Sequence, residues 1–189
     1  MAPSPPAVGL YVDFVVRGFV ADPQSSVPVL VLQDLGERFF LPIWIGLPEA
    51  TAIAAHLGGQ PTPRPMTHDL IRLILERLGG VVTRVDVRAI EEGVFLADLW
   101  IRDGAGGDHR IDCRPSDAIA LAVRVDAPIR VAAAVLEAAH PAHLDEATVP
   151  PAGLPAVLTA VPVDDAAACA LLLKTLAEMD PADFGKYRA

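Results

Sequence analysis

The chain has 189 residues, of which 52% are hydrophobic and 21% are charged, and its formal net charge is −9 at pH 7. This length and apolar content are enough to bury a core in one domain, which excludes an intrinsically disordered protein. The acidic balance argues against broad electrostatic attraction to nucleic acid, because phosphate binding usually uses a basic surface.

Three strands open the chain. Valine, phenylalanine and tyrosine recur with rough alternation over residues 9–20, 27–33 and 38–45, which predicts a strand in each range. Short segments rich in Asp, Pro, Ser and Gly separate them and have the composition of turns. We therefore expect an antiparallel meander.

Two helices follow the meander. Pro48 and Glu49 suit the first turn of a helix that ends at Leu57, because proline needs no N–H there and an acidic side chain complements the helix dipole. Thr67 is interpreted as the N-cap of the second helix, which ends before Gly79. Its apolar residues have helical spacing and predict one apolar face made of Leu70, Ile71, Ile74, Leu75 and Leu78.

The same order of three strands and a helix then occurs again. We predict strands at 81–90, 94–102, 109–113 and 129–131 and helices at 116–125 and 132–139. Ser116 is interpreted as the N-cap of the first of these helices. The fold class that follows is α+β, with antiparallel or mixed β-sheet meanders and helices packed on them, in a domain over residues 8–139.

The end of the chain has a different composition. Residues 140–162 are rich in Pro and Ala and have weak periodicity, which predicts a linker. Residues 163–189 have helical spacing of apolar positions and an acidic balance, so we expect a C-terminal helix and tail there. Neither segment is basic, so the sequence contains no separate basic domain.

The sequence also bears on location. Cys113 and Cys169 are too few for a disulfide framework. The Pro-rich start at residues 1–6 lacks the features of a signal peptide, and no apolar run reaches the ~20 residues of a membrane span. We expect a soluble, cytoplasmic protein without membrane contact.

Three motifs place polar groups at helix starts. Glu49 follows Leu41-Pro42-Ile43-Trp44-Ile45-Gly46, and Arg64 precedes Thr67-His68-Asp69. Asp112 is followed by Arg114, Ser116 and Asp117, just before the apolar run Ile119–Val123. Helix N-termini have free N–H groups and a partial positive charge, so three of them brought together are suited to bind a phosphate or carboxylate.

A purely structural interpretation competes with this one. Thr67 and Ser116 have the residue types of simple N-caps, and Asp69 and Asp117 stabilise a first helical turn without any catalysis. Arg114 with Asp112 or Asp117 is equally suited to a structural ion pair. Residue types alone leave both interpretations open.

The three motifs together resemble the bifunctional nuclease family, a bacterial and plant domain described as degrading DNA and RNA. The resemblance covers about residues 10–139 and depends on LPIWIG with Glu49-Ala50, on RP-x-THDL from Arg64 to Leu70, and on IDCRPSDAIALAVR from Ile111 to Arg124. Cys113 stands where a small alanine is usual. The resemblance implies phosphodiester hydrolysis of nucleic acid, assisted by a divalent metal.

Such a reaction needs an activated water, charge stabilisation on the phosphate and protonation of the leaving group. His68 is the candidate acid or base, since imidazole titrates near neutral pH, and arginines are suited to grip phosphate oxygens. The candidate catalytic residues are Glu49, His68, Asp69 and Asp117. The candidates for substrate binding are Arg64, Thr67, Arg114 and Ser116, and those for Mg²⁺ or Mn²⁺ are Glu49, Asp112 and Asp117.

The alternative function is a non-enzymatic ligand-binding or protein-interaction module on the same fold. The net charge of −9 favours it, and so does the suitability of the candidate residues as caps. The apolar, weakly charged body favours self-association. We expect a homodimer, with a trimer as the second choice.

Overall fold

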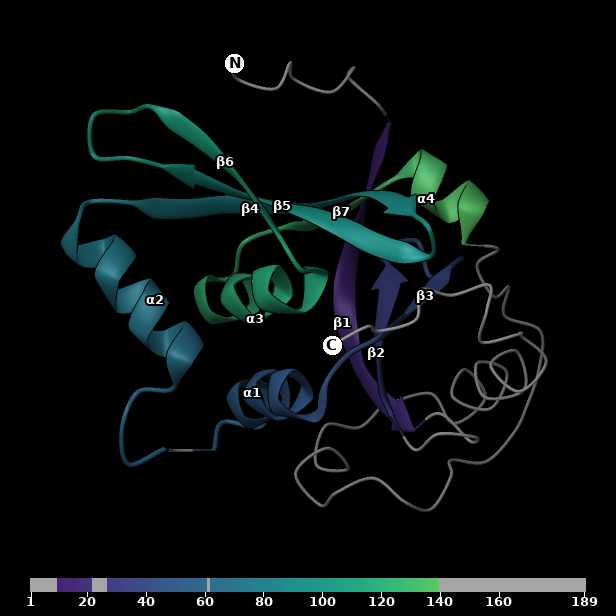
Figure 1. The fold of residues 1–189 in the computed structure, drawn as a ribbon, viewed down its shortest axis with the longest axis horizontal. Helices are drawn as coiled ribbons and strands as arrows, with labels where there is room; N and C mark the ends of the chain where they lie inside the picture. The colour runs from purple at the N-terminus through teal and green to yellow at the C-terminus, as the bar shows by residue number, and fades with distance from the viewer. Residues whose placement is uncertain (1–9, 22–26, 61, 140–189) are drawn as a thin grey trace.

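The computed structural model describes residues 10–21, 27–60 and 62–139, which form one mixed sheet of seven strands and four helices (Figure 1). The α+β class expected from the sequence is confirmed. The strands are β1 Tyr11–Ala21, β2 Pro28–Asp34, β3 Phe40–Trp44, β4 Val81–Glu91, β5 Val94–Arg102, β6 Asp108–Cys113 and β7 Ile129–Ala132. The helices are α1 Leu47–Leu57, α2 Thr67–Arg77, α3 Pro115–Val125 and α4 Ala133–Ala138.

The short strand β7 joins two meanders into one sheet. The strand order is β3-β2-β1-β7-β4-β5-β6, so each predicted meander is present with neighbouring strands antiparallel. Strand β7 lies between them, antiparallel to β1 and parallel to β4. Arg130 of β7 is therefore in register with both Asp13 of β1 and Asp86 of β4.

Helix α3 lies at the centre of the packing. It contacts β4 and β5 on one side and both α1 and α2 on the other (Figure 1). Ile119 and Ala120 are completely buried in it, as the apolar run predicted, and Ile53 of α1 is completely buried as well. This arrangement brings the helices that follow the three motifs into contact.

The helix starts differ from two of the sequence predictions. The N-cap of α2 is Met66, and the N-cap of α3 is Arg114, so the prediction that Thr67 and Ser116 are N-caps is wrong. Helix α3 begins early because Pro115 occupies its first position, where a missing N–H costs nothing. In α2, the Met66 N–H donates to the Asp69 carboxylate over 2.9 Å and satisfies the cap without a threonine hydroxyl.

The apolar face of α2 is largely exposed. Leu78 is 76% exposed and Leu70 53%, and the only buried residue within α2 is His68. The spacing correctly predicts a helix with one apolar face. Leu75 is partly buried and packs against the core, whereas Leu70, Ile71, Ile74 and Leu78 stay exposed among the described residues.

The predicted linker at 140–162 and the predicted tail at 163–189 lie outside the described residues. Within the described part of the chain, no helix has the length and apolar character required to span a membrane.

Candidate functional site

Four side chains from the starts of α1, α2 and α3 contact one another, and we call them the helix-start cluster: Glu49, His68, Arg114 and Asp117. The Arg114 guanidinium lies 2.8 Å from a Glu49 oxygen and donates to both Asp117 oxygens, over 2.7 and 3.1 Å. His68 Nε2 lies 3.3 Å from Asp117 Oδ1. Residues separated by up to 68 positions along the chain, from Glu49 to Asp117, thus share one charge network.

The two carboxylates occupy equivalent places. Glu49 and Asp117 are each the third residue of their helix, where an acidic side chain is stabilised by the N-terminal partial charge. The Glu49 side chain folds back over Gly46, so a Cβ at that position would overlap its carboxylate. Gly46 therefore leaves the space in which Glu49 turns toward Arg114.

The electrostatics of the helix-start cluster favour the charged forms of Arg114 and Asp117. Burial opposes ionisation of Asp117, but hydrogen bonds from Arg114 and His68 outweigh it, so the pKa of this carboxyl lies below its ordinary value. The hydrogen bond to Asp117 raises the pKa of Arg114 further, despite partial desolvation. One guanidinium is thus shared by two carboxylates.

His68 is the least satisfied member of the cluster. The residue is only 7% exposed, and Nδ1 is buried with no hydrogen-bond partner among the described residues. A buried polar atom without a partner costs about 1–3 kcal/mol. Because Asp117 orients the ring through its other nitrogen, the arrangement resembles a base held by an orienting carboxylate.

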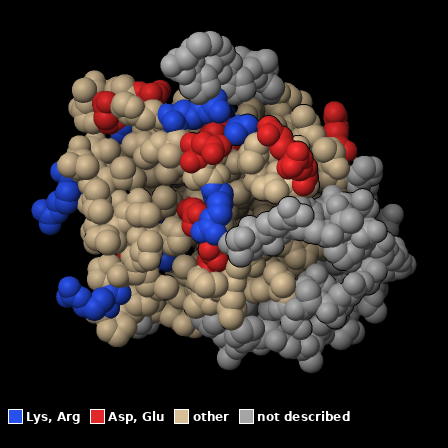
Figure 2. All heavy atoms as spheres, viewed as in Figure 1, with Lys and Arg blue, Asp and Glu red and all other residues tan. Residues whose placement is uncertain are grey.

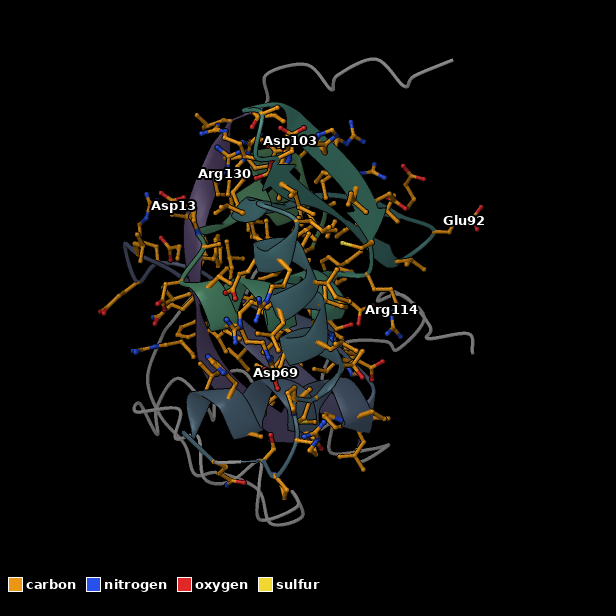
Figure 3. All side chains as sticks on the ribbon, turned by 90° about the vertical axis from the view of Figure 1, so that its left-hand side faces the viewer. Asp13, Asp69, Glu92, Asp103, Arg114 and Arg130 are labelled. Carbon is orange, nitrogen blue, oxygen red and sulfur yellow. The ribbon has the colours of Figure 1, made fainter. Side chains whose placement is uncertain are left out.

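Asp69 belongs to a different contact, although it is next to His68 in sequence. Its Oδ1 accepts a 2.6 Å hydrogen bond from Arg124, which also donates to the Ala120 and Ala52 carbonyl oxygens. Burial opposes ionisation of Asp69, and the bonds from Arg124 and the Met66 N–H more than offset it, so the pKa of Asp69 is lowered. Figure 3 shows Asp69 and Arg114 well separated along the helices.

Arg124 was not singled out from the sequence. An arginine in the last turn of a helix is ordinarily a surface residue that complements the dipole, and Arg124 occupies that position in α3. Its side chain is nevertheless only 2% exposed. One clue was available, because the residue lies at the end of a run that is otherwise entirely apolar.

The remaining predicted residues lie apart from the helix-start cluster. Asp112 points to the other side of the sheet and pairs with Arg88 over 2.9 Å. Arg64 and Thr67 are exposed and Ser116 is buried, and within the described ranges none of the three makes a side-chain hydrogen bond or ion pair. The set of Glu49, Asp112 and Asp117 therefore does not converge, and the described residues contain no group of three acidic, His or Cys side chains suited to a metal ion.

The surface does not show one dominant charge. Figure 2 shows basic and acidic side chains next to each other near the middle of the viewed face, with isolated basic side chains at one edge. The local positive charge of Arg114 is accordingly balanced by neighbouring carboxylates.

Comparison with known proteins identifies the family of the chain. The family model of the bifunctional nuclease domain matches residues 30–143, and the chain belongs to this family. An uncharacterized protein of Mycobacterium tuberculosis is 44% identical over 117 residues, which are 62% of this chain and 68% of that protein.

More distant relatives come from rice. Bifunctional nuclease 2 of Oryza sativa subsp. japonica is 29% identical over 113 residues, 58% of this chain and 34% of that protein. The bifunctional nuclease of Oryza minuta is 29% identical over 105 residues, 54% of this chain and 31% of that protein. The matched family region contains all four residues of the helix-start cluster.

Proposed function

We propose that this protein is a nuclease that hydrolyses phosphodiester bonds of DNA and RNA at the helix-start cluster. The observation that carries the proposal is the buried His68, held by Asp117 through one ring nitrogen while the other has no partner among the described residues. Membership of the bifunctional nuclease domain family supports the same chemistry.

Each residue of the helix-start cluster has a separate role in this reaction. His68 transfers a proton to or from a reacting oxygen, and Asp117 holds the imidazole in position. The Arg114 side chain is 50% exposed, so its guanidinium is accessible to phosphate oxygens while the carboxylates position it. Glu49 is the second anchor of Arg114.

Dependence on Mg²⁺ or Mn²⁺ stays a prediction. Glu49 and Asp117 both bind Arg114, and Asp112 binds Arg88 on the other side of the sheet, so these three carboxylates do not fit one ion as arranged. Assays with EDTA, and then with each ion restored, test the dependence directly.

The decisive experiment compares cleavage of single-stranded DNA, duplex DNA and RNA by purified wild-type protein and by His68→Ala and Asp117→Ala. Each variant is expected to lose activity by about 100-fold or more, the usual size of an acid–base contribution. Circular dichroism confirms that the variants fold. Undiminished activity in both would remove these residues from the mechanism.

A matched control is available on β6. His109 lies 2.6 Å from Asp103, so it is also a histidine paired with an aspartate, but both side chains are exposed in a hairpin outside the helix-start cluster. His109→Ala should cleave like wild type. Equal losses in His109→Ala and His68→Ala would indicate a general effect of substitution or purification, and undiminished cleavage in both would indicate either a contaminating host nuclease or no catalytic role for His68.

The second candidate function, a protein-interaction module, is favoured by the exposed apolar face of α2. Leu70, Ile71, Ile74 and Leu78 are all at least 36% exposed, and such a patch is typical of a contact with another protein. We propose that it pairs two copies of this chain in a homodimer, with a trimer as the second choice. Light scattering after size exclusion tests this, and a particle of 19.9 kDa, the mass of one chain, would contradict it.

A further inference from the structure

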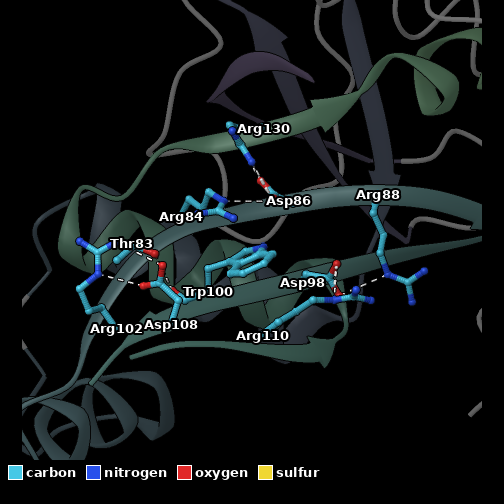
Figure 4. Close-up of polar contacts among 10 residues, drawn as sticks. All are labelled: Thr83, Arg84, Asp86, Arg88, Asp98, Trp100, Arg102, Asp108, Arg110 and Arg130. Carbon is cyan, nitrogen blue, oxygen red and sulfur yellow. Dashed lines mark hydrogen bonds and ion pairs between the residues drawn. The ribbon is translucent and has the colours of Figure 1, made fainter. Parts of the chain in front are cut away.

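The face of the sheet opposite α3 has an organised polar surface on β7, β4, β5 and β6 (Figure 4). Residues that alternate with the buried Val85, Val87, Ala97 and Leu99 point to this side, because successive side chains of a strand lie on opposite faces. We call it the arginine face. It comprises Arg84, Asp86, Arg88, Asp98, Trp100, Arg110 and Arg130.

Two buried aspartates form the base of the arginine face. Asp86 and Asp98 are directly opposite each other on β4 and β5, and their side chains are only 4% and 2% exposed. Like charges in this position repel each other. Each carboxylate is therefore compensated by two arginines rather than one.

The arginines lie across these carboxylates in a fixed geometry. Asp86 accepts hydrogen bonds from Arg130 over 2.7 and 2.9 Å and from Arg84 over 3.2 Å. Asp98 lies 3.0 Å from Arg110 and 3.3 Å from Arg88. The four arginine side chains keep between 22% and 31% of their surface exposed, so they are held in place and still accessible.

Aromatic rings extend this surface. The Arg84 guanidinium lies 3.9 Å from the centre of the Trp100 ring, and that of Arg130 lies 4.7 Å from the centre of the Tyr11 ring. The indole N–H of Trp100 is buried and has no hydrogen-bond partner among the described residues. Together with Tyr11 of the neighbouring strand β1, the arginine face therefore presents two pairs of a guanidinium over an aromatic ring.

The charges of the arginine face are balanced. Four arginines are offset by Asp86 and Asp98, by Asp112, which pairs with Arg88, and by Asp13, which is in register with Arg130. A ligand held only by phosphate attraction does not fit such a surface. Flat guanidinium and aromatic planes fit unstacked bases, which stack on them largely independently of sequence.

We propose that the arginine face binds single-stranded nucleic acid, an inference that rests on the proposed nuclease function. The edge strand β6 connects it to the helix-start cluster, since Asp112 precedes Arg114 by two residues. A single strand of nucleic acid bound on the arginine face reaches the helix-start cluster around the sheet edge formed by β6. Duplexes bind poorly, because their bases are already stacked and paired. The acidic net charge of the chain is consistent with recognition by stacking.

The test measures binding of a fluorescein-labelled oligothymidine of about 12 nucleotides, of the matching oligouridine, and of a mixed-sequence duplex of the same length, by fluorescence anisotropy. The full chain carrying His68→Ala is used in EDTA, and gels confirm that the probes stay intact. Single strands are expected to bind at least about tenfold more tightly than the duplex, with a weak dependence on salt. Equal affinity for the duplex would overturn the proposal.

Three variants locate the binding. The double variant Arg84→Gln/Arg110→Gln leaves each buried aspartate one arginine. The variant Trp100→Leu removes an aromatic ring. Both variants should weaken single-strand binding about tenfold. Arg84→Lys keeps the positive charge and loses the planar guanidinium, so it should also weaken binding. Because the charge next to Asp86 is kept, this variant disturbs folding least. Arg72→Gln, which removes an arginine of α2 that pairs with Glu76, should bind normally.

Unchanged binding in all three variants would overturn the proposal. So would a change in oligomeric state without any change in oligonucleotide binding, because the arginine face would then be a subunit contact. These outcomes are separable from the fate of the nuclease proposal. Normal binding by His68→Ala alongside normal cleavage would reject His68 as a catalyst without affecting the arginine face.

Discussion

Helix α3 has an arginine at each end, and the two occur in contrasting environments. Arg124, near the C-terminal end, is 2% exposed and donates to the Asp69 carboxylate and to two backbone carbonyls from α1 and α3. Arg114, at the N-terminal end, is 50% exposed and is shared by Glu49 and Asp117. One end is a closed structural contact, and the other is accessible to a ligand.

The first turn of α2 supplies a partner to both ends. His68 reaches toward Asp117, and Asp69 reaches toward Arg124. His68 and Asp69 are neighbours in sequence but have different partners, because successive helical residues point about 100° apart. The contrast teaches that two neighbouring residues of one motif can belong to separate contacts, one with Asp117 and one with Arg124.

The largest expected effect is on stability at the closed end. Asp69→Ala leaves the buried Arg124 without a counter-charge and should lower the free energy of unfolding by about 3 kcal/mol. Urea denaturation measures it. Glu76→Ala is the control, because Glu76 pairs with Arg72 on the exposed side of α2 and should cost at most about 0.5 kcal/mol. Equal costs for the two variants would contradict the interpretation of Asp69 and Arg124 as a buried structural contact.

The next effect is on activity at the open end. Asp117→Asn keeps the shape of the side chain and leaves Arg114 its contact with Glu49, so the free energy of unfolding should fall by about 1 kcal/mol. Cleavage should fall by about 100-fold, because the histidine loses its orienting charge. Parallel urea denaturation and cleavage assays check both values. A loss of stability as large as that of Asp69→Ala would make Asp117 a structural residue.

Lowering the pH should weaken the ion pairs at both ends of α3. The pKa values of Asp69 and Asp117 are lowered in the folded protein, so their stabilisation is complete above the ordinary value of 3.8 and is lost as the pH falls through the lower folded values. Urea midpoints measured from about pH 6 down to about pH 2 should therefore decrease. The decrease should be smaller in Asp69→Asn. A variant with the full wild-type decrease would exclude Asp69 as a contributor.

The smallest expected effect belongs to Arg64. It is exposed in the loop before α2, and its guanidinium has no partner in the described part of the chain. Arg64→Gln should change the free energy of unfolding by less than about 0.5 kcal/mol. If Arg64 contacts substrate as the family motif suggests, KM should rise while kcat stays unchanged. A thermal melt and steady-state kinetics measure the two quantities, and a fall in kcat alone would argue against a binding role.

Much of the secondary structure was predictable because it depends on local patterns. Alternating apolar residues specified the strands, and Pro48 and the glycines after Leu57 and Leu78 specified where helices begin and end. The N-caps were wrong because threonine and serine suit several positions of a first turn, and Pro115 moves the start of α3. The exposure of the apolar face of α2 could not be predicted either, since helical spacing shows that an apolar face exists but not what covers it.

The candidate site was predictable in its residue types and only partly in its membership. Motifs at three helix starts indicated that Glu49, His68, Arg114 and Asp117 are of interest, and they are in contact. Only the tertiary structure separated Asp69 and Asp112 from them, because each is held by an arginine, Arg124 or Arg88, from a distant part of the chain.

The sequence by itself determined the α+β class, the order of the elements and the family, because periodicity, turn chemistry and motifs are local properties of the chain. The tertiary structure decided that β7 joins the two meanders and that three helix starts meet around Asp117. It also decided that four arginines from three strands share two buried aspartates. These features depend on contacts between distant segments, which local patterns do not specify.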